Sequence, residues 1–327
     1  MRLASILVLV LIVAALLGGC ASPFDLQGHR GTRGLMPENT LPAFAKALEI
    51  GVTTLELDTN ITRDGIVVIA HDSVLNPDLA RLPDGKWLEV PVNKGPSIFS
   101  LSFSELQEFD VGRIKPGTKY AARYPEQQPQ DGTRIPKLAD LFALVRKSGN
   151  ERVRFNIETK LSPFELDLTP GPEAFVDALL GVIMQEEMRS RVNVESFDWR
   201  TLKIVQQRAP DIPTVYLSAQ QKWLDNINAE GLEGSAWTAG LNAREFGGSV
   251  ARMVKAAGGA VWSPYFGDVD QAKIQDAQNL GLKVVVWTVN EVKDIERMFD
   301  WKVNGIISDY PNRVREVMQK RGMALPR

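Results

Sequence analysis

Short apolar runs alternate with longer amphipathic stretches along most of the chain, starting near residue 26. The short runs are rich in β-branched residues and predict strands, while the longer stretches have the apolar spacing of helices. The predicted strands are 26–29, 53–60, 66–72, 153–160, 191–198, 213–219, 260–266, 283–290 and 305–311, and the predicted helices include 41–51, 173–188, 199–209, 270–281 and 290–301. This alternation is typical of parallel βα units.

About eight such units, with no G-x-G-x-x-G after the first strand, predict an α/β fold, the (β/α)8 TIM barrel, rather than a dinucleotide-binding sheet. Residues 73–135 interrupt the alternation, because this segment is rich in proline, glycine and charge and is too long for an ordinary loop. We therefore expect one barrel domain over residues 24–320, with an insertion after the second βα region. A second stretch, 220–250, also lacks clear periodicity.

The first twenty residues have a different pattern from the rest of the chain. Arg2 precedes an apolar run from Ile6 to Leu17, which is followed by two glycines and Cys20. The run is shorter than the roughly 20 apolar residues that span a membrane, so residues 1–20 are predicted to be a secretory signal peptide. An uncleaved N-terminal anchor helix is the alternative.

The end of this segment, LGGC at residues 17–20, resembles the lipobox of bacterial lipoproteins. The resemblance implies that Cys20 becomes the lipid-modified first residue of the mature protein. It also implies a periplasmic or otherwise extracytoplasmic domain, tethered to a bacterial membrane, the outer membrane in our interpretation, by acyl chains alone. Cys20 is the one cysteine of the chain, so no intramolecular disulfide is expected.

Composition narrows the class of protein further. The chain of 327 residues is 44% hydrophobic and 24% charged, which is typical of a globular protein with a large core. Its formal net charge is −2, and it has no lysine- or arginine-rich run interleaved with aromatic residues. Nucleic acid is therefore not expected as a partner. Nothing in the composition indicates an oligomeric state.

Polar residues close several of the predicted strands. His29 follows the first strand beside Arg30, and Glu56 and Asp58 lie two positions apart near the end of the second. The third strand closes on His71, and the fourth carries Glu158 and Lys160, again two positions apart. A spacing of two directs both side chains to the same face of a strand. In a barrel, residues at the carboxyl ends of the strands form the active site.

These residue types together indicate phosphoryl chemistry. Glu56, Asp58 and Glu158 offer oxygen ligands, which suit Mg²⁺ or Ca²⁺ better than zinc. Arg30 and Lys160 would face the same cavity, and a cation with two basic side chains is a suitable clamp for phosphate. The chain has two histidines, His29 and His71, and they would supply a general base and a general acid near neutral pH.

Five short motifs in this order resemble the glycerophosphodiester phosphodiesterase family. They are GHRG at 28–31, PENT at 37–40, ELD at 56–58, HD at 71–72 and IETK at 157–160, and VVWTVN at 285–290 and GIISDYP at 305–311 resemble the family's last strands. The likeness covers residues 26–315. It implies a TIM barrel that hydrolyses glycerophosphodiesters to sn-glycerol 3-phosphate and an alcohol. We interpret PENT mainly as helix capping, with Thr40 as the cap.

The resemblance also implies a role for each matching residue. Glu56, Asp58 and Glu158 match the divalent-metal ligands, and Arg30 and Lys160 match the phosphate-binding cations. His29 matches the base, His71 matches the leaving-group acid, and Trp287 matches an aromatic residue near the glycerol. The attacking group is either water or the neighbouring glycerol hydroxyl, which would first give a cyclic phosphate.

Two other functions are compatible with these residues. A phospholipase-like phosphodiesterase would act on intact lipids and would need an apolar surface, whereas the segment 73–135 is polar. A non-catalytic lipoprotein that binds phosphodiesters would need the phosphate clamp but not the histidines.

Overall fold

The computed structural model describes residues 24–228, 231 and 233–326. The predicted signal peptide and the predicted lipidation site Cys20 lie outside the described residues. Among the helices that the structure describes, none is both long enough and apolar enough to cross a membrane.

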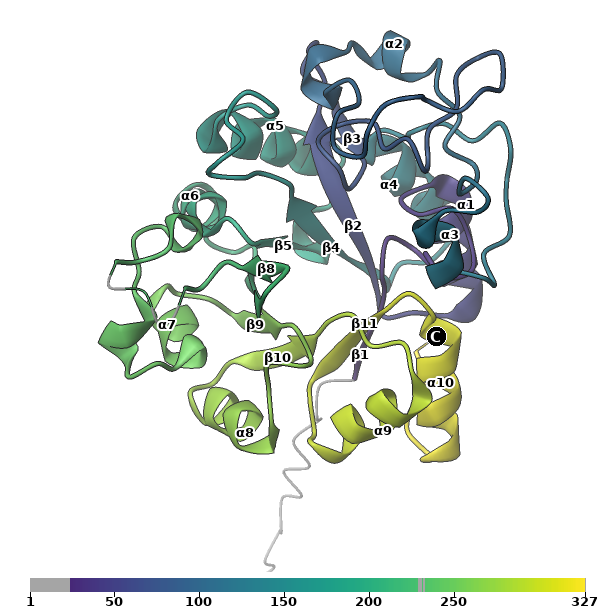
Figure 1. The fold of residues 1–327 in the computed structure, drawn as a ribbon. Coiled ribbons are helices and arrows are strands. Elements are labelled where there is room, and N and C mark those ends of the chain that lie inside the picture. The colour runs from purple at the N-terminus through teal and green to yellow at the C-terminus, as the bar shows by residue number, and fades with distance from the viewer. Residues whose placement is uncertain (1–23, 229–230, 232, 327) are drawn as a thin grey trace, which may run out of the picture.

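In the described part of the chain, eight parallel strands form a closed barrel (Figure 1). They are β1 (Asp25–Gly28), β2 (Thr54–Ile61), β4 (Arg154–Thr159), β5 (Val192–Ser196), β6 (Thr214–Ser218), β9 (Val261–Pro264), β10 (Lys283–Val286) and β11 (Gly305–Ser308). Strand β1 closes the ring by pairing with both β2 and β11. The predicted TIM barrel is confirmed.

A helix follows each barrel strand and packs on the outside of the ring (Figure 1). These helices are α1 (Leu41–Ile50), α4 (Leu138–Lys147), α5 (Pro172–Gln185), α6 (Trp199–Arg208), α7 (Val250–Ala256), α8 (Gln271–Asn279), α9 (Val292–Asp300) and α10 (Pro311–Lys320). The main hydrophobic core lies between the strands and these helices, because alternate strand residues such as Leu55 and Leu57 point outward.

The interior of the barrel has an apolar half and a polar half. Strands β6, β9, β10 and β11 contribute an apolar cluster of Val215, Val261, Val285 and Ile307. On the other side, Asn156 Nδ2 donates to Gln27 Oε1 at 3.0 Å and to Glu195 Oε2 at 2.6 Å. The polar half therefore contains the strands that carry the acidic residues.

The predicted strand 66–72 is not a barrel strand. Only β3 (Val67–Ile69) forms there, and it pairs antiparallel with the end of β2. The reason is the length of the connection. Residues 62–66 are enough for a hairpin turn, whereas a parallel crossover needs a dozen or more residues. His71 therefore reaches the barrel mouth from a hairpin, and not from the carboxyl end of a barrel strand.

The segment between β3 and α4 includes the two short helices α2 (Phe103–Leu106) and α3 (Lys119–Arg123). It has a small hydrophobic core of its own, which Val68, Leu75, Ala80, Ile98, Leu106 and Ile135 form. In Figure 1 this segment extends beyond the ring next to β2 and β3. It connects the second barrel strand to its helix, so it belongs to a loop at the carboxyl end of the barrel. A smaller hairpin of β7 (Gln220–Gln221) and β8 (Leu224–Asp225) follows β6.

Candidate active site

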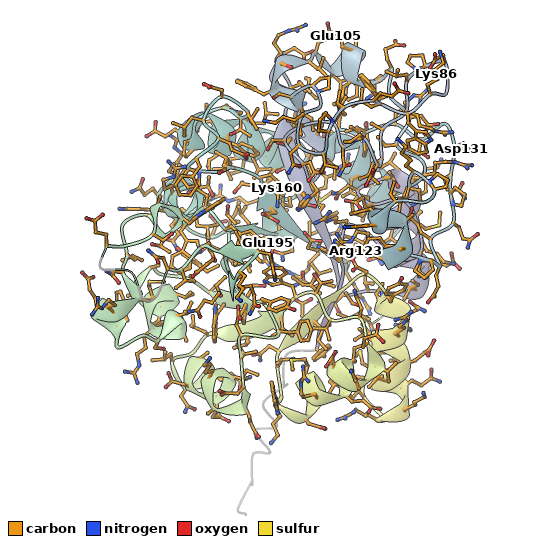
Figure 2. The ribbon with its side chains drawn as sticks, viewed as in Figure 1. Lys86, Glu105, Arg123, Asp131, Lys160 and Glu195 are labelled. Carbon is orange, nitrogen blue, oxygen red and sulfur yellow. The ribbon has the colours of Figure 1, made fainter. Side chains whose placement is uncertain are left out.

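A cavity of about 500 Å³ opens at the carboxyl ends of the barrel strands. All seven site residues predicted from the strand ends, together with Trp287, lie at this end of the barrel, and all but Asp58 line the cavity. Asp58 is not among the lining residues and is 1% exposed. In Figure 2, Lys160 and Glu195 lie near the centre of the ring, whereas Lys86, Glu105 and Asp131 lie at the edge of the molecule.

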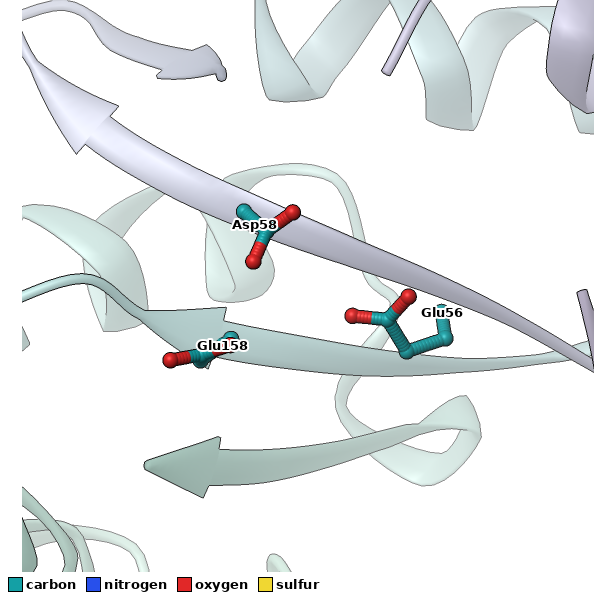
Figure 3. Close-up of side chains that lie close together, drawn as sticks. All are labelled: Glu56, Asp58 and Glu158. Carbon is teal, nitrogen blue, oxygen red and sulfur yellow. The ribbon is translucent and has the colours of Figure 1, made fainter. Parts of the chain in front are cut away.

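Three buried carboxylates meet at the base of the cavity (Figure 3). Glu56 and Asp58 share one face of β2, and Asp58 lies opposite Glu158 in the register of β2 and β4. One ligand oxygen of each side chain lies within 4.8 Å of the others. The spacing of two residues accounts for the first pair, and the strand register brings the third carboxylate to them.

A fourth carboxyl group, Glu195 on β5, was missed in the sequence. It pairs in register with Glu158, is 1% exposed, and lines the same cavity. The sequence did contain a signal for this residue. Glu195 lies two positions after Asn193 in a buried strand, so both polar side chains point to the same face of that strand.

Burial and mutual repulsion shift the protonation of this cluster. Burial and, to a lesser extent, the Asp58 carboxylate raise the pKa of Glu158 to about 8, although the Lys160 charge opposes the rise. Burial also raises the pKa values of Glu56 and Glu195 well above the ordinary value. Burial alone would raise the pKa of Asp58 as well, but the positive charges of Arg30 and Lys160 hold it well below its usual range.

The donor set fits a divalent cation of the hard type. All its atoms are carboxylate oxygens, as Mg²⁺ and Ca²⁺ prefer. The raised pKa values of Glu56 and Glu158 mean that the cluster lacks positive charge, and a bound cation would supply it. Glu56, Asp58 and Glu158 are therefore the residues that would hold the ion.

Two basic side chains border the carboxylates. Lys160 Nζ lies 2.9 Å from Glu158 Oε1 and 3.7 Å from Asp58 Oδ1. Arg30 Nε lies 3.2 Å from Asp58 Oδ2, and Arg30 Nη1 donates to Glu38 Oε1 at 2.6 Å. Both side chains line the cavity, where an anionic phosphate would meet them.

The loop from β1 to α1 supports the carboxylates from one side. The Arg30 backbone N–H donates to Glu56 Oε2 at 2.7 Å, and Asn39 Nδ2 donates to Asp58 Oδ2 at 2.8 Å. Thr40 caps α1, as predicted. However, PENT does more than cap a helix, because Glu38 and Asn39 contact Arg30 and a candidate metal ligand.

His29 lies at the mouth, with its ring held by an acidic partner. Its Nδ1 lies 2.7 Å from Asp309 Oδ1, which leaves Nε2 facing Glu56 Oε2 at 3.8 Å. Asp309 also accepts from Arg33 Nε at 2.7 Å and from Asn290 Nδ2 at 2.7 Å. Burial, together with the positive charge of Arg33, lowers the pKa of His29 to about 4. Asp309, which follows the apolar run of β11, is another polar strand end that was missed in the sequence.

His71 faces the same cavity from the hairpin side. Its Nδ1 lies 2.7 Å from Asp72 Oδ1, and Asp72 accepts from Asn76 Nδ2 at 2.8 Å. Burial lowers the pKa of His71, and the charges of Arg30 and Lys160 act in the same direction. Both imidazoles therefore have a carboxylate on Nδ1, which leaves Nε2 of each ring free of that partner.

Aromatic side chains form the wall of the cavity opposite the β2–β3 hairpin that carries His71. Trp287 Nε1 donates to Ser263 O at 3.0 Å, and its ring lies 5.3 Å from Phe197 and 6.1 Å from Trp223. Trp237 completes this wall, and its ring lies 6.0 Å from that of Phe164. Trp287 is thus in a position to contact a substrate, and its neighbours extend the apolar surface outward.

The chain matches proteins of one family over nearly its whole length. The model of the Glycerophosphoryl diester phosphodiesterase family matches residues 29–313. A glycerophosphodiester phosphodiesterase from Caldanaerobacter subterraneus is 27% identical over 294 residues, which cover 90% of this chain and 97% of that protein.

Solved structures give the same result. A crystal structure from Silicibacter pomeroyi, of a protein assigned to this class of enzyme, has a TM-score of 0.81 and 33% identity, and the match covers 92% of this chain and 95% of that one. An Oleispira antarctica phosphodiesterase in complex with the product sn-glycerol-3-phosphate has a TM-score of 0.63 and 20% identity over 90% and 96% of the two chains. The second likeness shows the fold alone.

Proposed function

Because the chain belongs to the glycerophosphoryl diester phosphodiesterase family, we propose that its barrel mouth hydrolyses glycerophosphodiesters to sn-glycerol 3-phosphate and an alcohol. One observation carries this proposal: three clustered carboxylates, two basic side chains and both histidines gather at a single cavity. A module that only binds phosphodiesters would not need two imidazoles there.

We assign the phosphate-binding site to Arg30 and Lys160. Their charges oppose the negative charge that develops in phosphoryl transfer. Glu56, Asp58 and Glu158 would hold a divalent cation, which would supply further positive charge to offset the negative charge of the phosphate. The carboxylates suit both Mg²⁺ and Ca²⁺, so the native ion is to be identified by titration.

His29 is the proposed base. Its low pKa keeps the ring neutral at pH 7, and Asp309 fixes the proton on Nδ1, so Nε2 can accept a proton from the attacking group, which is either water or the neighbouring glycerol hydroxyl. His71 is the proposed acid that protonates the leaving oxygen. A bound phosphodiester would place negative charge beside this ring and favour its protonated form. Trp287 would then contact the glycerol.

Release of sn-glycerol 3-phosphate from glycerophosphocholine tests this assignment. His29→Ala and His71→Ala are each expected to lower kcat by roughly 10²–10⁴-fold, the usual contribution of a general acid or base. Chelation should stop the wild-type reaction, and Mg²⁺ or Ca²⁺ should restore it. Lys86→Ala, at the edge of the molecule in Figure 2, is the control and should keep wild-type kinetics.

The same measurements can refute the proposal. If both histidine variants retain wild-type turnover, the acid–base assignment is wrong. If the metal-loaded protein binds glycerophosphocholine without hydrolysing it, the protein is a phosphodiester-binding lipoprotein.

One observation favours the second candidate, action on lipids. Four of the six most exposed large apolar side chains in the described residues lie on loops around the cavity: Val92 (56% exposed), Phe164 (72%), Leu166 (68%) and Trp223 (59%). Three of them lie outside the polar segment 73–135, on the β4–α5 loop and the β7–β8 hairpin. Together they could cover an acyl chain on the glycerol.

A comparison of glycerophosphocholine with lysophosphatidylcholine and phosphatidylcholine distinguishes these substrates. For a glycerophosphodiesterase, kcat/KM is highest for glycerophosphocholine, and Trp223→Ala has little effect on the ranking. Hydrolysis of the lipids alone, weakened by Trp223→Ala but not by the control Trp87→Ala, would instead establish a phospholipase-like enzyme.

For the location of the protein, we propose a periplasmic domain tethered to the bacterial membrane through a lipidated Cys20. The proposal rests on the LGGC sequence at residues 17–20. Incorporation of labelled fatty acid by the wild type but not by Cys20→Ser tests it.

A further inference from the structure

The segment between β3 and α4 is docked against the loop that carries Arg30. Gln127 Nε2 donates to Arg33 O at 2.7 Å, and the Gln128 backbone N–H donates to Leu35 O at 2.8 Å. The Arg33 guanidinium lies over the Tyr124 ring, 4.8 Å from its centroid. Residues on and just after α3 are therefore fixed relative to the β1–α1 loop.

This docking brings Tyr120, on α3, to the side chain that holds Arg30. The Tyr120 hydroxyl donates to Glu38 Oε2, and the other oxygen of the same carboxylate accepts from Arg30 Nη1 at 2.6 Å. The side chains of Glu38 and Arg30 are only 7% and 8% exposed. Both carboxylate oxygens thus have a donor, in a place where water screens their interactions poorly.

We propose that Tyr120 is a positioning residue of the active site: through Glu38, it holds the Arg30 guanidinium in place for the substrate phosphate. This inference rests on the proposed function, since it assumes that Arg30 binds phosphate. It makes the segment between β3 and α4 a functional part of the site.

The other partner of Arg30 explains why Glu38 needs a fixed orientation. Arg30 Nε lies 3.2 Å from Asp58 Oδ2, but Asp58 is also a candidate metal ligand. If Asp58 also held a cation, Glu38 would be the main anionic partner of Arg30. A carboxylate held at one oxygen can rotate about its terminal bond, whereas hydrogen bonds at both oxygens restrict this rotation.

Arg30 also has a constrained backbone. Its φ is 50°, in the left-handed region, and its N–H is used by Glu56 Oε2. The backbone of Arg30 is therefore held by Glu56, and its guanidinium is held by Glu38. The position of the guanidinium depends on both contacts, and Tyr120 acts on the contact with Glu38.

Tyr120→Phe is the most direct test, because it removes the hydroxyl and keeps the ring that packs against Tyr124 at 5.2 Å. We expect kcat/KM for glycerophosphocholine to fall about tenfold or more, as for loss of a hydrogen bond to a charged group. Competitive inhibition by inorganic phosphate should weaken by a similar factor. The affinity for Mg²⁺ or Ca²⁺, measured by calorimetry, should stay at the wild-type value, and the thermal unfolding midpoint should fall by only a few degrees, as for loss of one buried hydrogen bond. A purely structural role would not weaken phosphate binding selectively.

Tyr124→Phe is the matched control, since the contact of Tyr124 with Arg33 is made by its ring. Glu38→Gln provides a second route to the same conclusion, and it should weaken phosphate binding as Tyr120→Phe does. In the double variant the two effects should not add, because the hydroxyl acts through the carboxylate.

Wild-type phosphate affinity in both single variants would overturn the inference, and so would fully additive losses in the double variant. Phosphate binding to the metal-loaded protein is also measurable by calorimetry without turnover. A protein that bound phosphate through Arg30 but hydrolysed nothing would refute the proposed function and leave the role of Tyr120 testable.

Discussion

At the residue scale, Asn39 shows how a motif can have two functions. PENT places Thr40 at the start of α1, and the neighbouring Asn39 donates to Asp58 Oδ2 at 2.8 Å. A donor on a ligand oxygen orients that ligand before the ion arrives. Asn39 therefore belongs to the candidate metal site although it would not touch the ion.

We predict that Asn39→Gly lowers the affinity for Mg²⁺ or Ca²⁺ by roughly 10–100-fold, the usual cost of losing such a partner. Glycine is the suitable replacement because φ at this position is 55°. Calorimetric titration measures the affinity. Asn76→Gly, which removes a similar amide–carboxylate bond to Asp72, is the control. Equal metal affinity in the wild type and Asn39→Gly would contradict the prediction.

The raised pKa of Glu158 leads to a prediction about pH. The folded, metal-free protein binds a proton at Glu158 with a pKa of about 8, compared with about 4.5 for an ordinary glutamate. The stability that this group contributes is complete below pH 4.5 and is lost as the pH rises through 8. In chelator, the free energy of unfolding should therefore decrease between pH 5 and 8, by at most about 1.4 kcal/mol per pH unit for one proton.

Chemical denaturation at several pH values measures this slope. Glu158→Gln should make it shallower, whereas the control Glu165→Gln, an exposed carboxyl group at the cavity, should not. An unchanged slope in Glu158→Gln would show that Glu158 does not titrate in this range. Added divalent cation should remove the decrease, because it favours the ionised carboxylates.

At the scale of elements, the glycines of GHRG determine how the β1–α1 loop packs. A Cβ on Gly28 would lie 2.2 Å from Gly31 O, and one on Gly31 would lie 2.7 Å from the backbone carbon of Ala43 in α1. Gly31 also has a φ of 81°. The loop can therefore turn back onto α1 and bring His29 and Arg30 to the mouth only if both positions lack a side chain.

Gly31→Ala should separate the effects of backbone conformation and close contact. Gly65 has a similar φ of 79°, but a Cβ added there would have no atom within 4 Å, so Gly65→Ala should cost only the left-handed conformation, about 1–2 kcal/mol. Gly31→Ala should cost roughly 1–3 kcal/mol more, as overpacking usually does. Denaturant unfolding measures both values. Equal losses in the two variants would mean that α1 moves away without cost.

At the scale of the whole molecule, the barrel separates the first described residues from the active site. Strand β1 begins at Asp25 and ends at Gly28, next to His29, so the described chain begins at the end of the barrel opposite the mouth. A lipidated Cys20 would be five positions before Asp25, a reach of at most roughly 18 Å. We propose that the anchoring membrane faces the amino-terminal end of the barrel and that the mouth points away from it.

This orientation predicts that tethering does not impede soluble substrates. The lipidated protein in vesicles and the Cys20→Ser protein in solution should hydrolyse glycerophosphocholine with kcat/KM values that agree within about twofold, since both mouths meet the substrate by free diffusion. A coupled assay for sn-glycerol 3-phosphate measures both forms. A much slower tethered form would mean that the mouth faces the membrane, and would favour lipid substrates.

Local rules made much of this protein predictable. The alternation of strands and helices predicted the successive βα units, because hydrophobic periodicity is a property of consecutive residues. The spacing of two between Glu56 and Asp58 determined that both share a face, and Thr40 with Pro42 determined the start of α1. Even the antiparallel course of β3 was encoded locally, in a connection too short for a crossover.

Only the tertiary structure decided which distant residues meet. The register of β2, β4 and β5 placed Glu158 and Glu195 beside Asp58, and barrel closure brought Asp309 of the last strand to His29 of the first. The docking of α3 joined Tyr120 to Glu38. These contacts connect residues far apart in the chain, and their distances follow from strand register, ring closure and loop docking, which no local pattern of apolar and polar residues encodes.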